Sequence, residues 1–146
     1  MNQNLQALLK SELKLLSTSE DVLKYSYEQC KKIDLAQKLT ESEKIAFEAF
    51  SARFARSSDI LLQKIWRLID TLEFAPEGSV LDRIHRAEKR DFVNAEVFKK
   101  IRILRNEITH EYDPQDFLAI YQAILKAMPD LMSAIAKTKD YCQQKF

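Results

Sequence analysis

Apolar residues recur along most of this chain at alternating steps of three and four, the spacing of one face of an α-helix. The first such run consists of Leu9, Leu13, Leu16, Leu23, Tyr27 and Cys30. Glu20 occupies the one position of this face that apolar residues skip. The cap-forming residues 17–21 mean that either two helices meet there or one helix carries a polar patch. We expect one long helix ending near Ile33.

A second and longer helical pattern starts at a capping box, in which Thr40 precedes Glu43 by three residues. Its apolar positions are Ala46, Phe47, Phe50, Phe54, Ile60, Leu61, Ile65, Trp66, Leu68, Ile69 and Leu72. This face is wide, so the helix is expected to pack on two sides. The segment 74–79 contains the only glycine of the chain and predicts that this helix ends there.

The last third of the chain carries three further helix starts. Ser79 is placed to cap a short helix, and Asn94 to cap the next one. Pro114 suits the first position of a long final helix, where the missing N–H costs nothing. Pro129 falls inside that final helix and should kink or divide it.

Composition supports the same fold. With one glycine, three prolines and 46% hydrophobic residues, the 146 residues predict an all-α protein, an up-and-down helical bundle of about four long helices and a short one. No linker divides residues 1–146, so a single domain is expected. Cys30 and Cys142 are far apart in sequence and read as inert thiols of a reduced, cytoplasmic protein. No apolar stretch resembles a signal peptide or a membrane span, and no membrane partner is expected.

Charge is nearly balanced overall but not locally. The formal net charge is +1, so the molecule as a whole has no strong electrostatic field that would attract nucleic acid or anionic membranes. Between Arg83 and His110, however, eight Lys or Arg stand against four acidic residues. Such a run is also what an ordinary solvated helix surface looks like, and both interpretations stay open.

The candidate chemistry lies in one stretch of eight residues, which reads Arg105-Asn106-Glu107-Ile108-Thr109-His110-Glu111-Tyr112. Because successive helical residues turn by about 100°, Arg105 and His110 should diverge by about 140°. They can share a target only if the helix end is distorted or if two copies of the chain meet. If they do meet, the imidazole could move protons at a ribose 2′-hydroxyl while the guanidinium binds the phosphate. Asn106 could hold the imidazole in one orientation.

No cluster with metal-ligand spacing accompanies this stretch, so a metal mechanism is disfavoured, the chemistry would be metal-free RNA cleavage, and no cofactor is expected. A structural interpretation competes with it. Arg105 could pair with Glu111 or Asp113, His110 could cap the helix C-terminus, and Tyr112 could be a half-buried core aromatic. The other histidine, His85, is expected to be a surface residue.

At these residues the sequence resembles the HEPN family of small helical bundles, whose mark is an Arg followed after four to six residues by a His. Here Arg105 and His110 are separated by four residues, Asn106 follows the Arg directly, and Tyr112 follows the His by two. This longer form is similar to HEPN toxins encoded beside a minimal nucleotidyltransferase antitoxin. The order of the predicted helices extends the resemblance over nearly the whole chain.

The resemblance implies a homodimer with the two motifs at the subunit interface. It implies an endoribonuclease that leaves a 2′,3′-cyclic phosphate, with Arg105 and His110 as the catalytic pair and Asn106 as support. It also implies that a cognate nucleotidyltransferase antitoxin silences the toxin by attaching AMP to Tyr112.

Lys99 and Arg102 belong to the same basic helix and are the predicted RNA contacts. Two alternatives remain open. The chain could be a non-catalytic substrate-binding or partner subunit of a nucleotidyltransferase, or it could be a purely structural helical bundle.

Overall fold

The protein is a bundle of helices in a computed structural model that describes residues 2–110 and 114–146, and the side chains of residues 3–110 and 117–146. Every regular element within these residues is helical. In chain order they are α1 (Asn2–Cys30), α2 (Glu41–Asp59), the π-helix η1 (Ile60–Ile65), α3 (Trp66–Leu72), α4 (Val80–Lys89), α5 (Ala95–Ile108) and α6 (Pro114–Lys145). The prediction of an all-α helical bundle is confirmed.

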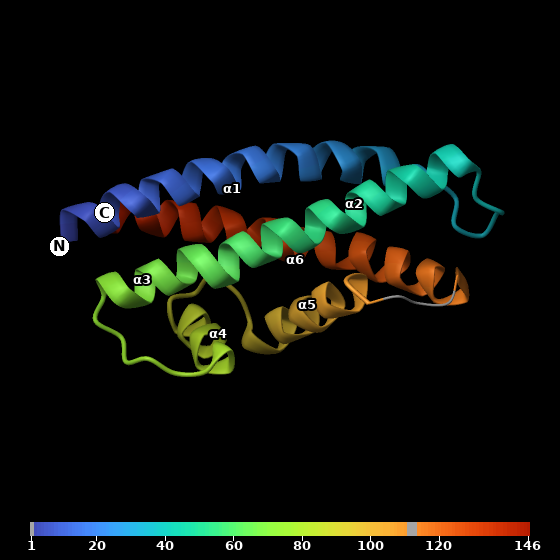
Figure 1. The fold of residues 1–146 in the computed structure, drawn as a ribbon. Helices are drawn as coiled ribbons and strands as arrows, with labels where there is room; N and C mark the ends of the chain where they lie inside the picture. The colour runs from blue at the N-terminus through green and yellow to red at the C-terminus, as the bar shows by residue number, and fades with distance from the viewer. Residues whose placement is uncertain (1, 111–113) are drawn as a thin grey trace.

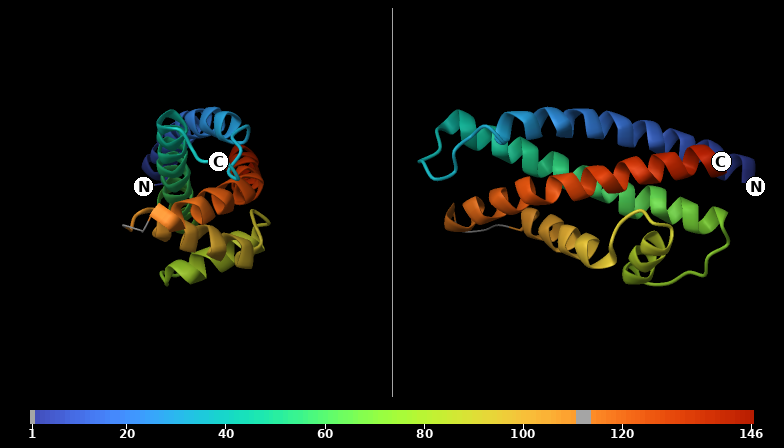
Figure 2. Two further views of the ribbon diagram at one scale, coloured as in Figure 1. Left: turned by 90° about the vertical axis from the view of Figure 1, so that its right-hand side faces the viewer. Right: turned by 180° about the vertical axis from the view of Figure 1, so that it is seen from behind.

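Four rods run up and down along the bundle (Figure 1). One is α1; α2, η1 and α3 join end to end into the second; α5 and α6 are the third and fourth. The short helix α4 lies beside α5 near α3. The rods α2–α3 and α6 lie between α1 on one side and α4 and α5 on the other, and the two termini lie at the same end (Figures 1 and 2).

Helix α1 is a single helix whose buried face includes the polar residues Ser19, Glu20 and Ser26. Its most buried apolar side chains repeat every seven residues and are Leu9, Leu16, Leu23 and Cys30, each at most 1% exposed. Glu20, at the skipped position, is 7% exposed, and its carboxylate accepts a hydrogen bond of 2.6 Å from Lys139 on α6. Burial of a charge requires such a partner. The expectation of one long helix is confirmed, and it ends at Cys30, just short of the predicted end near Ile33.

The second rod starts as predicted but changes geometry in its middle. The Thr40 hydroxyl accepts from the Glu43 amide at 3.1 Å, and the Glu43 carboxylate accepts from the Thr40 amide at 2.9 Å, which completes the capping box. After Asp59 the rod becomes a π-helix, and the Trp66 amide donates to the Leu61 carbonyl five residues back. The wider π turn accompanies three consecutive buried residues, 60–62, which one narrow α-helical face cannot bury.

The three later helix starts lie where the sequence predicts them. Ser79 and Asp82 form a reciprocal capping box on α4, and the Asn94 side chain accepts from two backbone amides in the first turn of α5. Helix α6 begins at Pro114 and runs unbroken through Pro129, so Pro129 does not divide it. None of the described helices combines the length and the apolar character needed to cross a bilayer.

Both cysteines are free and buried. Burial raises the pKa of the Cys30 thiol and of the Cys142 thiol to about 11. Both thiols therefore stay protonated at neutral pH, which favours the inert character expected from the sequence.

Candidate functional site

The last turn of α5 and the residues just beyond it carry the eight-residue motif. Arg105 and Asn106 lie in the helix, which ends at Ile108. Thr109 caps this end, since its amide and its hydroxyl both donate to the Asn106 carbonyl, at 3.3 and 2.9 Å. His110 follows in an irregular segment with an exposed side chain. The helix therefore ends between Arg105 and His110.

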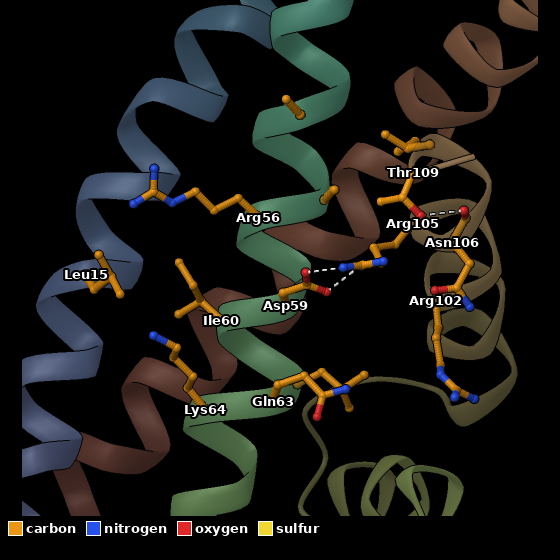
Figure 3. A pocket seen from close by; sticks show the side chains of 14 residues that line it. Leu15, Arg56, Asp59, Ile60, Gln63, Lys64, Arg102, Arg105, Asn106 and Thr109 are labelled. Atoms are coloured by element: carbon orange, nitrogen blue, oxygen red, sulfur yellow. Dashed lines mark hydrogen bonds and ion pairs between the residues drawn. The ribbon is translucent and has the colours of Figure 1, made fainter. Parts of the chain in front are cut away.

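Arg105 is held by a carboxylate from the second rod. Its Nε and Nη2 atoms each donate to one oxygen of Asp59, both at 2.7 Å, and the two planar groups face each other in a fork (Figure 3). The side chains remain 31% and 39% exposed, respectively. Hydrogen bonding to Asp59 raises the pKa of Arg105, so the guanidinium stays charged at every working pH.

Asp59 is a site residue that sequence analysis missed. The partners considered for Arg105 in the sequence, Glu111 and Asp113, lie outside the described residues. A signal for Asp59 does exist, because it is the only acidic residue in the stretch 49–69, where every other charged residue is basic. Nothing in the sequence, however, indicates which of the many basic residues it would meet.

The Asp59–Arg105 pair lies in an open hollow of about 860 Å³. The rod α2–η1 lies between α1 and α5 at this place. Small residues such as Ala52 and Ala55 line the hollow. Among the described residues, its charged lining consists of four basic residues and one acidic one: Arg56, Lys64, Arg102, Arg105 and Asp59. Figure 3 shows Arg56 and Lys64 extending on the α1 side of the rod, and Arg102 and Arg105 reaching from α5.

His110 lines a neighbouring hollow of about 200 Å³, which Phe117 and Tyr121 of α6 also line. Ala52 and Ile108 line both hollows, so the two adjoin. Within one chain the predicted catalytic residues thus face two adjacent spaces rather than one. Asn106 lines the hollow of Arg105, whereas His110 lines the other.

The remaining predicted site residues fall in different places. Arg102 lines the hollow of Arg105, but Lys99 does not, and its ammonium lies 2.9 Å from Glu96 on the same helix. Tyr112, the predicted modification site, lies outside the described residues. His85 is exposed on α4, as expected of a surface residue.

Several of the basic residues between Arg83 and His110 form ion pairs with acidic residues of the same chain. Asp70, which is 6% exposed, accepts hydrogen bonds from Arg86 at 2.9 Å and from Arg90 at 2.6 Å, while the Arg83 Nε atom lies 4.0 Å away. Arg90 also donates to Glu73 at 2.8 Å. The cationic surface is therefore smaller in the stretch 83–110 than the sequence indicates. Two basic residues from outside that stretch, on α2 and η1, extend it at the hollow.

Among residues 2–110 and 114–146, no group of three His, Cys, Asp or Glu side chains is arranged to hold a metal ion. Comparisons with known proteins found no matching family model, no matching curated protein and no matching solved structure.

Proposed function

We propose that the chain is a HEPN-type toxin, a metal-independent endoribonuclease in which Arg105 binds the scissile phosphate and His110 moves protons. One observation carries the proposal. The motif arginine lies in an open hollow with an excess of basic residues, and the motif histidine is exposed just beyond the same helix end. Both functional groups of the motif are therefore accessible to a substrate.

The proposed reaction is an internal transfer within RNA. The neutral His110 imidazole takes the proton of a ribose 2′-hydroxyl, and the 2′-oxygen attacks the adjacent phosphorus. The bond from phosphorus to the 5′-oxygen of the next nucleotide breaks, and the imidazolium returns a proton to that oxygen. The products are a 2′,3′-cyclic phosphate and a 5′-hydroxyl. Arg105 stabilises the negative charge that builds on the phosphate oxygens.

A second copy of the chain completes the proposed active site. Arg105 and His110 of one chain line two hollows with Ala52 and Ile108 in common, so one chain alone does not direct both groups into one space. In a symmetric dimer, each arginine can face the histidine of the other subunit. The HEPN resemblance implies the same arrangement.

Regulation is proposed to act on Tyr112. A nucleotidyltransferase antitoxin would join the tyrosine oxygen to the α-phosphorus of ATP, with release of pyrophosphate. The attached AMP would add bulk and negative charge close to Arg105 in sequence, and would compete with RNA for the basic residues there.

The test is incubation of the purified protein with RNA in the presence of EDTA. Wild type should cleave the RNA to fragments with 2′,3′-cyclic phosphate ends, and His110→Ala and Arg105→Ala should each lose this activity. Equal stability of the RNA with all three proteins would reject the nuclease.

The fork between Arg105 and Asp59 also favours a second candidate, a non-catalytic partner subunit of a nucleotidyltransferase. Two guanidinium atoms already donate to the carboxylate, which leaves fewer donors for a phosphate. A stable complex with the nucleotidyltransferase, without RNA cleavage by the protein alone, would select this candidate.

A further inference from the structure

We propose that the hollow between α1, α2–η1 and α5 is the binding groove for a single RNA strand. Arg56 and Lys64 on one side and Arg102 on the other would contact backbone phosphates that flank the scissile one. This inference rests on the proposed function and deepens it, because it names the surface along which the substrate lies. Neither Arg56 nor Lys64 belongs to the basic stretch that the sequence singles out.

The charge of the hollow favours an anionic ligand. Among the described residues that line the hollow, the only acidic one is Asp59. Both of its carboxylate oxygens accept hydrogen bonds from Arg105. Arg56 and Arg102 form no ion pair with any other residue in the described part of the chain. Lys64 has one acidic neighbour, Glu12, at 3.7 Å, and its side chain is 51% exposed. Three cations of the lining thus remain available to an anionic ligand.

These cations lie on both sides of the hollow. Arg56 and Lys64 extend on the α1 side of the rod, while Arg102 projects from α5, and the Asp59–Arg105 fork lies between them (Figure 3). A free phosphate needs donors that converge on one point, but these basic groups are spread over the two sides. Their spread suits a ligand that carries several phosphates in a row, which is the character of a nucleic acid strand.

The lining also indicates how the strand is recognised. Among the described residues that line this hollow none is aromatic, and small or aliphatic residues such as Ala52, Ala55 and Ile60 provide its uncharged surface. Base stacking on aromatic rings, a common feature of sequence-tolerant single-strand binders, is therefore not available from the described lining. Recognition would be electrostatic, through the backbone, and its affinity should depend strongly on salt.

The test measures binding of a labelled single-stranded oligoribonucleotide by fluorescence anisotropy at several salt concentrations. A His110→Ala background prevents cleavage during the measurement. The groove variant carries Arg56→Gln and Lys64→Gln. The control variant carries Lys126→Gln and Lys137→Gln, two exposed lysines of α6, which contributes no residue to the hollow. Circular dichroism and thermal unfolding check that both variants fold.

Loss of two phosphate contacts should flatten the slope of log K against log salt by about 1.4, and weaken binding roughly 25-fold at about 0.1 M salt. The control variant should bind like its parent, and AMP should compete far more weakly than unlabelled oligonucleotide. The groove is overturned if the two variants bind RNA equally, if the parent binds no RNA, or if AMP competes as well as the oligonucleotide.

Failure of the groove and failure of the nuclease are distinguishable. RNA binding that depends on Arg56 and Lys64, without any cleavage by the protein with intact His110, would keep the groove and reject the nuclease. Cleavage at the wild-type rate and affinity by the Arg56→Gln, Lys64→Gln variant would keep the nuclease and reject the groove.

Discussion

The fork between Asp59 and Arg105 is the contact that most shapes the candidate site. Both side chains are partly exposed, so the pair contributes about 1 kcal/mol or less to folding stability. Its main effect is geometric, because two parallel hydrogen bonds fix the plane of the guanidinium. The same carboxylate also competes with any phosphate for that guanidinium. In the proposed nuclease, Asp59 would thus be a positioning residue that orients Arg105 and weakens substrate binding.

These two roles predict a split between kinetic constants in Asp59→Asn. Without the fork, Arg105 is less well oriented, and kcat of RNA cleavage should fall roughly 10- to 100-fold. Removal of one negative charge should strengthen RNA binding, so KM should fall about fivefold at about 0.1 M salt. Steady-state kinetics on a labelled oligoribonucleotide measure both constants. Asp130→Asn, an exposed position on α6, is the matched control.

A purely structural role for Asp59 would lower the melting temperature and leave both constants of the folded protein unchanged. That result would contradict the prediction. A rise in KM would contradict it as well, because it would mean that the carboxylate helps to bind the substrate.

The sequence predicted one half of this site and missed the other. Arg105, Asn106 and His110 are recognisable because they lie close together in a spacing that has chemical meaning. Asp59 and Arg56 belong to the site only through packing of α2 against α5, and Asp59 is 46 residues away from Arg105. Helical periodicity shows that two such faces are buried, but not which polar residues at their edges will meet.

At the scale of the elements, the ends of α3 and α4 show that local sequence rules do not identify which residue adopts the left-handed conformation after a helix. Each is followed by a residue with positive φ, Phe74 at 57° and Asp91 at 65°. The Ala75 amide donates to the Asp70 carbonyl at 2.8 Å, so α3 ends in the bonding pattern that usually has glycine at the left-handed position. The sequence predicted a break here from Gly78, yet Gly78 does not occupy the left-handed position.

Phe74→Gly should therefore stabilise the protein. The left-handed conformation costs a non-glycine residue roughly 1–2 kcal/mol, and glycine loses part of that gain through its larger entropy in the unfolded chain. The Phe74 ring is 83% exposed, so little packing is lost. We expect the free energy of unfolding in urea to rise by roughly 0.5–1 kcal/mol.

Asp91→Gly is the matched comparison, because aspartate tolerates the left-handed region better than phenylalanine and the gain should be smaller. A lower stability of Phe74→Gly would show that the exposed ring contributes contacts that outweigh the strain.

Helix starts were more predictable than helix geometry. Thr40, Ser79 and Asn94 act through hydrogen bonds to residues two or three positions away, and the sequence contains both partners of each bond. The π-helix at Ile60–Ile65 depends instead on how much of the rod is covered by its neighbours. The wide apolar face predicted packing on two sides, but a widened turn cannot be deduced from that width.

At the scale of the whole molecule, the all-α bundle was predictable because its strongest signals are local and mutually consistent. The distribution of charge was less so. Counting residues between Arg83 and His110 gives a basic region, whereas the fold directs Arg86 and Arg90 onto Asp70. Formation of the basic hollow depends instead on the tertiary arrangement, which brings α2 and η1 beside α5.

The proposed active site also makes a prediction about the whole assembly, by complementation. Arg105→Ala and His110→Ala should each be inactive, but a mixture allowed to exchange subunits should regain activity. In a mixed dimer, one site combines the intact arginine of one chain with the intact histidine of the other, and the second site has neither. Random mixing at equal amounts should restore about a quarter of the wild-type rate, since half of the dimers are mixed and each has one intact site.

The control is the double variant Arg105→Ala, His110→Ala mixed with wild type. In its mixed dimers each site lacks one of the two residues, so no site is intact. Activity should then come only from the wild-type dimers that remain. A site formed within a single chain gives the opposite pattern: the two single variants never complement each other, and the double variant leaves half of the sites in each mixed dimer intact. Comparing the two mixtures thus determines whether the guanidinium and the imidazole, which face adjoining hollows in one chain, act together across the subunit boundary.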